Sequence, residues 1–89
     1  MDNAQLNGLR VMVIDDSKTI RRTAETLLTK EGCAVMTAVD GFEALAMISD
    51  HQPHIIFVDI MMPRLDGYQT CALIKNNQQF KNTPVIMLS

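Results

Sequence analysis

The sequence predicts an α/β protein in which helices cover both faces of a doubly wound parallel sheet. Four short apolar runs recur along the chain, and segments with helical spacing separate them. The runs are Val11–Ile14, Ala34–Ala38, Ile55–Val58 and Val85–Leu88. They are apolar on consecutive residues rather than alternating, which is typical of strands buried on both faces. Strands that alternate with helices indicate right-handed crossovers and parallel pairing.

The first helix is expected between the first two strands, because one apolar stripe runs along that segment. The stripe consists of Ile20, Ala24, Leu27 and Leu28. Charged residues fall mostly on the other faces, and Arg21 and Arg22 are placed on the exposed side. Gly32 stands where a helix commonly ends in a left-handed conformation.

Capping residues predict where the second and third helices begin. Asp40 precedes Glu43 by three residues, and Asp66 precedes Gln69 by three, which is a capping-box pattern with Asp in place of Ser or Thr. The second helix should end before Pro53. The side chains expected to point inward from these helices are Ala44, Leu45, Ile48, Tyr68, Cys71 and Ile74.

Length, composition and charge limit what this domain could do. The 89 residues allow one domain with a thin core, and a hydrophobic share of 47% argues against disorder. The formal charge is -2, and no basic cluster exceeds the pair Arg21 and Arg22, so no nucleic-acid partner is expected. No apolar run approaches the roughly 18 residues of a membrane span, and the N-terminal residues MDNAQLNG lack the basic segment followed by an apolar one that is typical of a secretory signal. We therefore expect a cytoplasmic protein.

The cysteines and histidines form no metal-ligand pattern. Cys33 and Cys71 lie far apart without a CxxC motif, which predicts reduced, buried side chains. His51 and His54 precede the third strand without a partner ligand, and we expect them to be solvated loop residues.

Acidic residues follow two of the predicted strands. The first strand leads into Asp15 and Asp16, and the third into Asp59. Ligands of doubly wound sheets bind at this edge, so three carboxylates would meet there if the two strands are neighbours. Two like charges about 4 Å apart cost roughly 4 kcal/mol at an effective dielectric near 20, which calls for a cation. All-oxygen ligands favour Mg²⁺, with Mn²⁺ able to replace it and Ca²⁺ less suited. The competing interpretation is that one acid caps the first helix and another faces solvent.

Two acids that hold a metal leave the third free to act as a nucleophile. A carboxylate beside Mg²⁺ can attack phosphorus and form an aspartyl phosphate. Asp59 is the natural candidate, because it follows the central strand and precedes a loop stiffened by Pro63, while Gly67 permits a tight turn into the third helix. Ser89 offers a hydroxyl that could bond a phosphoryl oxygen, although it could equally be a serine without a role.

Three segments of the chain resemble the receiver domain of response regulators. They are VMVIDDSKTIR around the acidic pair, FVDIMMPRLDGYQ around Asp59, and TPVIMLS at the fourth strand. The resemblance runs from about Leu9 to Ser89 and is strongest to receivers of the chemotaxis-like pathways that control type IV pili and twitching motility. It implies a flavodoxin-like receiver fold with strand order 2-1-3-4-5. Residues 1–89 would form one receiver domain, with a flexible lead over about residues 1–8.

The resemblance also implies roles for individual residues. Asp59 would accept a phosphoryl group from the phosphohistidine of a histidine kinase or a histidine phosphotransfer domain. Asp16 and Asp59 would bind Mg²⁺ directly, with Asp15 acting through water and the main-chain carbonyl of Met61 as a further ligand. Ser89 matches the Ser/Thr whose hydroxyl moves toward the phosphoryl group during activation.

The implied function is that of a bacterial regulator that promotes phosphotransfer to its own Asp, not that of an enzyme acting on other substrates. Arg21 and Arg22 lie on the helix that partners of receivers commonly contact, so they are candidate docking residues. The downstream target would be a pilus-motor or regulatory protein.

One departure from the family pattern is large. The pattern continues through a fourth helix, a fifth strand with a phosphate-binding lysine and an aromatic switch residue, and a fifth helix, and these 89 residues lack all of them. We therefore expect a receiver truncated after the fourth strand and incomplete at its C-terminus. Val85–Leu88 would then be an open apolar edge, the sheet would be partly uncovered beside the first helix, and the chain would self-associate.

Three other functions compete with the receiver interpretation. An aspartate-nucleophile phosphohydrolase usually carries a second Asp two residues after the nucleophile, where this chain has Met61 after Asp59 and Ser17 after Asp15. A flavin or dinucleotide domain would need a Gly- or Ser/Thr-rich loop after the first strand, where the acidic pair would repel phosphate. A receiver-like scaffold that is never phosphorylated stays open as the main alternative.

Overall fold

The computed structural model describes residues 6–61 and 66–88 of the chain. Strands and helices alternate over these residues as the sequence predicts. In chain order they are β1 (Arg10–Ile14), α1 (Lys18–Lys30), β2 (Ala34–Ala38), α2 (Gly41–His51), β3 (Ile55–Asp59), α3 (Gly67–Lys75) and β4 (Val85–Leu88). The only differences from the expected strands are that β1 begins one residue earlier and β3 ends one residue later.

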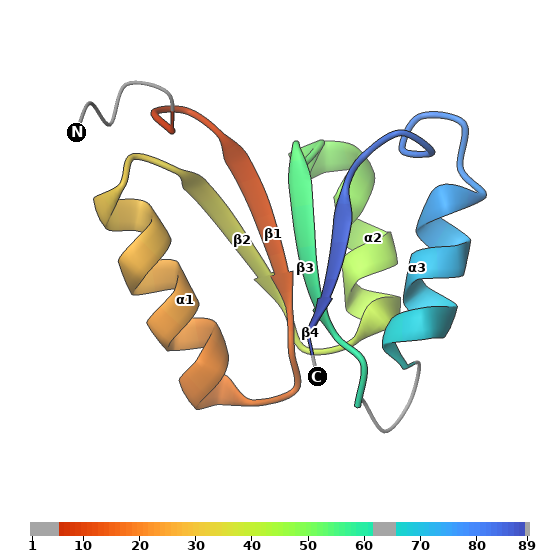
Figure 1. The fold of residues 1–89 in the computed structure, drawn as a ribbon, viewed down its shortest axis with the longest axis horizontal. Helices are drawn as coiled ribbons and strands as arrows, with labels where there is room; N and C mark the ends of the chain where they lie inside the picture. Colours follow the sequence, from red (N-terminus) through yellow and green to blue (C-terminus); the bar gives the residue numbers. More distant parts are fainter. Residues whose placement is uncertain (1–5, 62–65, 89) are drawn as a thin grey trace.

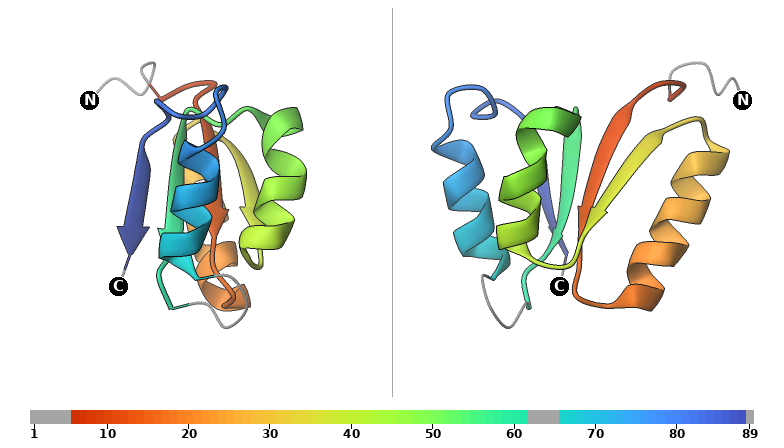
Figure 2. Two further views of the ribbon diagram at one scale, coloured as in Figure 1. Left: turned by 90° about the vertical axis from the view of Figure 1, so that its right-hand side faces the viewer. Right: turned by 180° about the vertical axis from the view of Figure 1, so that it is seen from behind.

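The sheet is parallel throughout, with the strand order β2-β1-β3-β4. Helix α1 covers one face, and α2 and α3 cover the other (Figures 1 and 2). The order reverses between β1 and β3, so the chain leaves these two neighbouring strands toward opposite faces. This is the doubly wound arrangement that the sequence predicts, and it opens a ligand position at the carboxyl ends of β1 and β3.

The predicted caps are present at both helices of the two-helix face. Asp66 and Gln69 form a complete capping box: the Asp66 carboxylate accepts the Gln69 N–H at 2.8 Å, and the Gln69 carbonyl accepts the Asp66 N–H at 3.2 Å. At α2 the Asp40 carboxylate accepts the Glu43 N–H at 2.9 Å. The Glu43 carboxylate instead reaches the N–H of Val39, also at 2.9 Å. The second box therefore closes one residue earlier than the pattern predicts.

The larger core lies between the sheet and the two helices α2 and α3. Alternate side chains of the central strands fill it, because successive residues of a strand point to opposite faces. Its buried members are Met12, Ile14, Ala38, Ala44, Ile48, Ile56, Val58, Ile74 and Phe80. The smaller core, under α1, contains only Val11, Val13 and Cys33 as buried residues.

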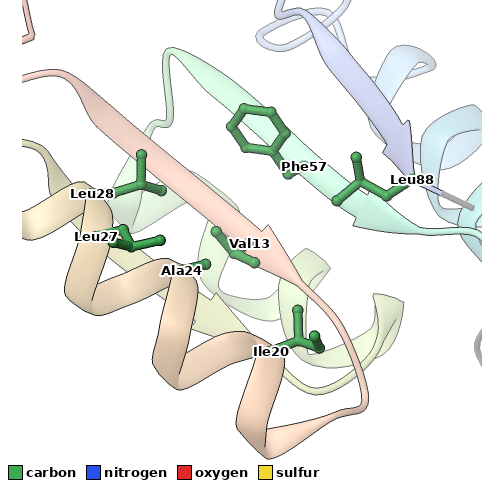
Figure 3. A pocket seen from close by; sticks show the side chains of 7 residues that line it. All are labelled: Val13, Ile20, Ala24, Leu27, Leu28, Phe57 and Leu88. Atoms are coloured by element: carbon green, nitrogen blue, oxygen red, sulfur yellow. The ribbon is translucent and has the colours of Figure 1, made fainter.

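An apolar groove of about 320 Å³ runs along the α1 face of the sheet (Figure 3). Its walls are the side chains of Val13, Ile20, Ala24, Leu27, Leu28, Phe57 and Leu88. Ile20 is 49% exposed and Leu27 is 58% exposed, although both belong to the stripe that should face the core. Within the described ranges, β4 pairs only with β3, and its Ile86, Met87 and Leu88 are exposed. The uncovered face and the open apolar edge expected from the sequence are therefore both present.

Two expectations about α3 and the cysteines need correction. Tyr68 was expected to point inward but is 61% exposed, and Thr70 is fully buried instead. The inward side of α3 passes through Gly67, Thr70 and Ile74, which places Tyr68 outside. Both cysteines are free thiols, as predicted, but only Cys33 is buried, while Cys71 is half-buried.

Both histidines contact the main chain of β1. The His51 ring at the end of α2 lies with Nε2 3.1 Å from the main-chain oxygen of Val11. Nδ1 of His54 accepts the main-chain N–H of Arg10 at 2.8 Å. These hydrogen bonds link the segment before β3 to the neighbouring strand. His54 is exposed in the loop before β3, as expected, whereas His51 is half-buried at the end of α2 and does not lie in a loop.

Candidate functional site

Three acidic side chains converge where β1 and β3 end. Asp15 and Asp16 directly follow β1, and Asp59 is the last residue of β3. Because these strands are parallel neighbours, their carboxyl ends lie side by side. One oxygen from each carboxylate lies within 4.8 Å of the others. The convergence predicted from the sequence is therefore present in the structure.

Asp15 is the covered member of the cluster, with 8% of its surface exposed. Its Oδ1 accepts the Ser17 N–H at 2.8 Å, in the same turn where the Ser17 hydroxyl caps α1 by accepting the Ile20 N–H at 3.3 Å. Burial raises the pKa of Asp15, and the charges of Asp59 and Asp16 raise it further, against the opposing effects of the Ser17 N–H and of Arg21. Folding therefore disfavours the ionised form of Asp15, and a bound cation would offset this effect.

Asp16 and Asp59 form the accessible side of the cluster. Asp16 is exposed and Asp59 is half-buried. Oδ1 of Asp59 accepts the main-chain N–H of Met61 at 3.0 Å, which orients the carboxylate at the end of β3. The side chain of Met61 is 76% exposed. Asp16 and part of Asp59 are thus accessible from solvent, whereas Asp15 is covered.

Helix α3 packs closely against the end of the strand that carries Asp59. A Cβ atom at Gly67 would lie 2.6 Å from Cα of Ile60 and 2.7 Å from the main-chain oxygen of Asp59. No side chain fits at that distance, so glycine is required by close approach rather than by an unusual φ. The position was identified in the sequence as a tight turn, and the contact explains why it must be glycine.

Two residues singled out from the sequence, Pro63 and Ser89, lie outside the described residues. The preceding residue, Leu88, is the register partner of Asp59, and its main-chain oxygen accepts the Ile60 N–H at 3.1 Å. The fourth strand therefore runs beside the strand that carries Asp59, as the role predicted for Ser89 requires. The proposed role of its hydroxyl stays a prediction, and so does that of the Met61 carbonyl.

The two arginines of α1 differ in their environment. Arg22 is exposed, as expected for a docking residue. Arg21 is half-buried, and its Nη1 donates to the main-chain oxygen of Asp15 at 2.8 Å. The helical pattern placed both residues on the exposed side, because it does not show that a long side chain can reach back to the loop before the helix. No observation of this structure tests docking at either residue.

The donor set suits a hard divalent cation. All three side chains offer carboxylate oxygens. Asp15 is covered, Asp59 is half-buried and Asp16 is exposed, which fits an ion that keeps part of its water shell. The mutual repulsion that raises the pKa of Asp15 is the repulsion such an ion would offset.

Among the described helices, none combines the length and the apolar character needed to cross a membrane.

Residues 11–89 match the family model of the response regulator receiver domain. The chain therefore belongs to the response-regulator receiver family, a class of two-component and chemotaxis-type signalling proteins.

Among curated proteins, Protein PilG of Pseudomonas aeruginosa is 80% identical over 85 residues, an alignment that covers 96% of this chain and 63% of PilG. The chain thus spans less than two thirds of this relative. A solved structure of chemotaxis protein CheY4 from Vibrio cholerae superposes with a TM-score of 0.87 at 34% identity, over 90% of this chain and 67% of that one. For the receiver domain of the Francisella response regulator 1452 the values are 0.82 and 38%, over 92% and 66%.

Proposed function

We propose that this domain accepts a phosphoryl group on Asp59, in a site that takes Mg²⁺. The observation that carries the proposal is the convergence of three carboxylate oxygens within 4.8 Å at the carboxyl ends of β1 and β3. Asp59 is half-buried at the end of β3, with one oxygen held by the Met61 N–H at 3.0 Å. It is thus both oriented and reachable, as a nucleophile requires.

Several residues would bind the ion, and one of them, Asp59, would also attack phosphorus. Asp16 and Asp59 would hold Mg²⁺ directly, Asp15 would act through water, and the Met61 carbonyl would complete the protein ligands. When bound, the ion neutralises the charge of the carboxylates and of the transferring phosphoryl group. The Ser17 N–H holds the Asp15 carboxylate at 2.8 Å, which preserves the spacing of the cluster when the ion exchanges.

The transfer itself needs few groups from the protein. An oxygen of Asp59 forms a bond to the phosphorus of a phosphohistidine as the P–N bond breaks, and the electron pair of that bond returns to the imidazole of the donor. The product is an acyl phosphate on Asp59. Such loose phosphoryl transfers depend mainly on alignment and on neutralised charge, and the cluster supports both.

The similarity to PilG supports a particular pathway. We infer that the donor is a histidine kinase or histidine phosphotransfer domain of a chemotaxis-like system in the bacterial cytoplasm. The phosphorylated domain would act on a pilus-motor or regulatory protein to control type IV pili and twitching motility. The 80% identity to PilG supports this inference.

Phosphorylation by a small acyl phosphate tests the proposal. The purified protein is incubated with Mg²⁺ and acetyl phosphate, and the modified residue is mapped by mass spectrometry. Asp59 should carry the phosphoryl group, and Asp59→Asn should carry none. Asp50→Asn, at an exposed acid of α2, is the matched control and should be modified like the wild type.

The same experiment separates the alternatives. A phosphoryl group on another residue, with Asp59 unmodified, would refute the proposal. No modification at any Mg²⁺ concentration would favour a scaffold that never takes phosphate. Sustained release of phosphate from an unrelated phosphomonoester would favour a phosphohydrolase, although Met61 stands where such enzymes usually carry their second Asp.

A further inference from the structure

Arg21 belongs to α1, and its side chain forms a hydrogen bond with the main chain of the acidic cluster. Its Nη1 donates to the main-chain oxygen of Asp15 at 2.8 Å, across six positions of sequence. The side chain is half-buried, whereas that of Arg22 is exposed. A guanidinium bonded to a carbonyl forms a charge-assisted hydrogen bond, which is stronger and more directional than a neutral one.

This bond fixes the peptide that links Asp15 to Asp16. The carbonyl that Arg21 holds belongs to the same planar group as the N–H of Asp16, so the bond limits where the Asp16 side chain begins. On the other side of Asp16, the Ser17 N–H is bonded to the Asp15 carboxylate at 2.8 Å. Asp16, which is exposed and follows the end of β1, is therefore flanked by two fixed points.

We propose that Arg21 is a positioning residue of the cation site, which holds the Asp15–Asp16 peptide so that Asp16 faces Asp59. This inference rests on the proposed Mg²⁺ site. Two effects of Arg21 on the ion oppose each other: its charge repels a cation, and its hydrogen bond orders a ligand of that cation. The bond dominates, because the charge is half-exposed and screened by solvent, while the bond acts directly on the ligand's backbone.

The sign of the change in Mg²⁺ affinity distinguishes these effects. Mg²⁺ is titrated by calorimetry into the metal-free wild type and into Arg21→Gln, Arg21→Lys and the control Arg22→Gln. Arg21→Gln should weaken binding about fivefold, because the bond is already present without the ion and only the ordering of Asp16 before binding is lost. Arg21→Lys should lose about threefold, because lysine keeps the charge and a donor but not the planar fork. Arg22→Gln should stay within about twofold of the wild type.

A second measurement detects the ordering itself. Hydrogen exchange at the amides of Asp16 and Ser17 should be faster in metal-free Arg21→Gln than in the wild type, with no change in Arg22→Gln. Should Arg21→Gln fail to fold, the comparison of Arg21→Lys with Arg22→Lys replaces it. Tighter or unchanged Mg²⁺ binding by the Arg21 variants would overturn the inference but not the proposed site. Absence of Mg²⁺ binding by the wild type would overturn both.

Discussion

The two faces of the sheet share the same strands, yet helices cover them to different extents. On the face under α2 and α3, Met12, Ile14 and Ile56 have no exposed surface. On the face under α1, Phe57 is half-buried and Leu27 is 58% exposed at the groove. Successive residues of one strand, such as Ile56 and Phe57, therefore have different surroundings. An apolar sequence pattern therefore creates surfaces that require cover, while the number of helices packed on each face decides how much cover they receive.

The largest effect should appear when a β3 side chain is truncated to alanine, first on one face of the sheet and then on the other. Ile56→Ala opens a cavity in the core under α2 and α3. It should cost about 3 kcal/mol of unfolding free energy, because the surrounding side chains cannot fill the cavity. Phe57→Ala, one residue along, should cost about 1 kcal/mol, since its ring already borders solvent. Urea denaturation measures both. Equal losses would show that the α1 face is packed as tightly as the other.

The next effect concerns self-association through the α1 face of the sheet. We expect this chain to self-associate through the groove and the neighbouring edge of β4, because exposed apolar surface and an unpaired strand both favour contacts with a second copy. Leu27→Gln should weaken the association about tenfold, as expected for one leucine removed from an interface.

Sedimentation equilibrium over a range of concentrations measures this association. Tyr68→Gln is the matched control: Tyr68 is 61% exposed, but it lies on α3 at the opposite face. A wild type that stays monomeric at every concentration would contradict the expectation, and so would equal weakening by both variants.

A smaller effect is expected at the carboxylate cluster, which lies at the edge where the two faces meet. Asp15→Asn should raise the unfolding free energy of the metal-free protein by about 1 kcal/mol at neutral pH, because it removes a buried charge beside two others. The asparagine oxygen can still accept the Ser17 N–H. Saturating Mg²⁺ should stabilise the wild type more than the variant. Thermal unfolding with and without Mg²⁺ measures both changes.

The same substitution predicts a pH dependence. The folded-state pKa of Asp15 lies above its ordinary value of 3.8, so the folded protein holds this proton more tightly than the unfolded chain does. The stability of the metal-free wild type should fall as pH rises from about 3.8 through the raised pKa, and the loss should be complete above it. Asp15→Asn should lose less over this interval. A variant that follows the wild-type curve would show that Asp15 does not carry the effect.

The smallest expected effect is the difference in stability lost when a helix cap is removed on each face. Asp66→Ala removes the complete box at α3, with its bonds of 2.8 and 3.2 Å, and should cost about 1 kcal/mol. Ser17→Ala removes a single bond of 3.3 Å at α1 and should cost about half as much. Chemical denaturation of the two variants resolves the difference. A larger cost for Ser17→Ala would indicate that α1 depends more on its cap because it packs less.

Elements determined by short-range patterns could be predicted from the sequence. Consecutive apolar residues located all four strands to within one residue, and Asp66 with Gln69 marked the start of α3. The acidic cluster was also predictable, because parallel strands bring their carboxyl ends to one edge. Locating the acidic residues at the ends of the first and third strands is enough to predict it.

Contacts between distant residues were decided by the tertiary structure alone. His54 bonds Arg10 across 44 positions, and His51 lies against Val11 across 40. Two further features likewise depend on where neighbouring elements pack: the orientation of α3 about its axis, which exposes Tyr68, and the hydrogen bond from Arg21 to Asp15. Periodicity and capping record the preferences of residues three or four positions apart. The partner of a long polar side chain depends instead on distances that exist only once the sheet has formed.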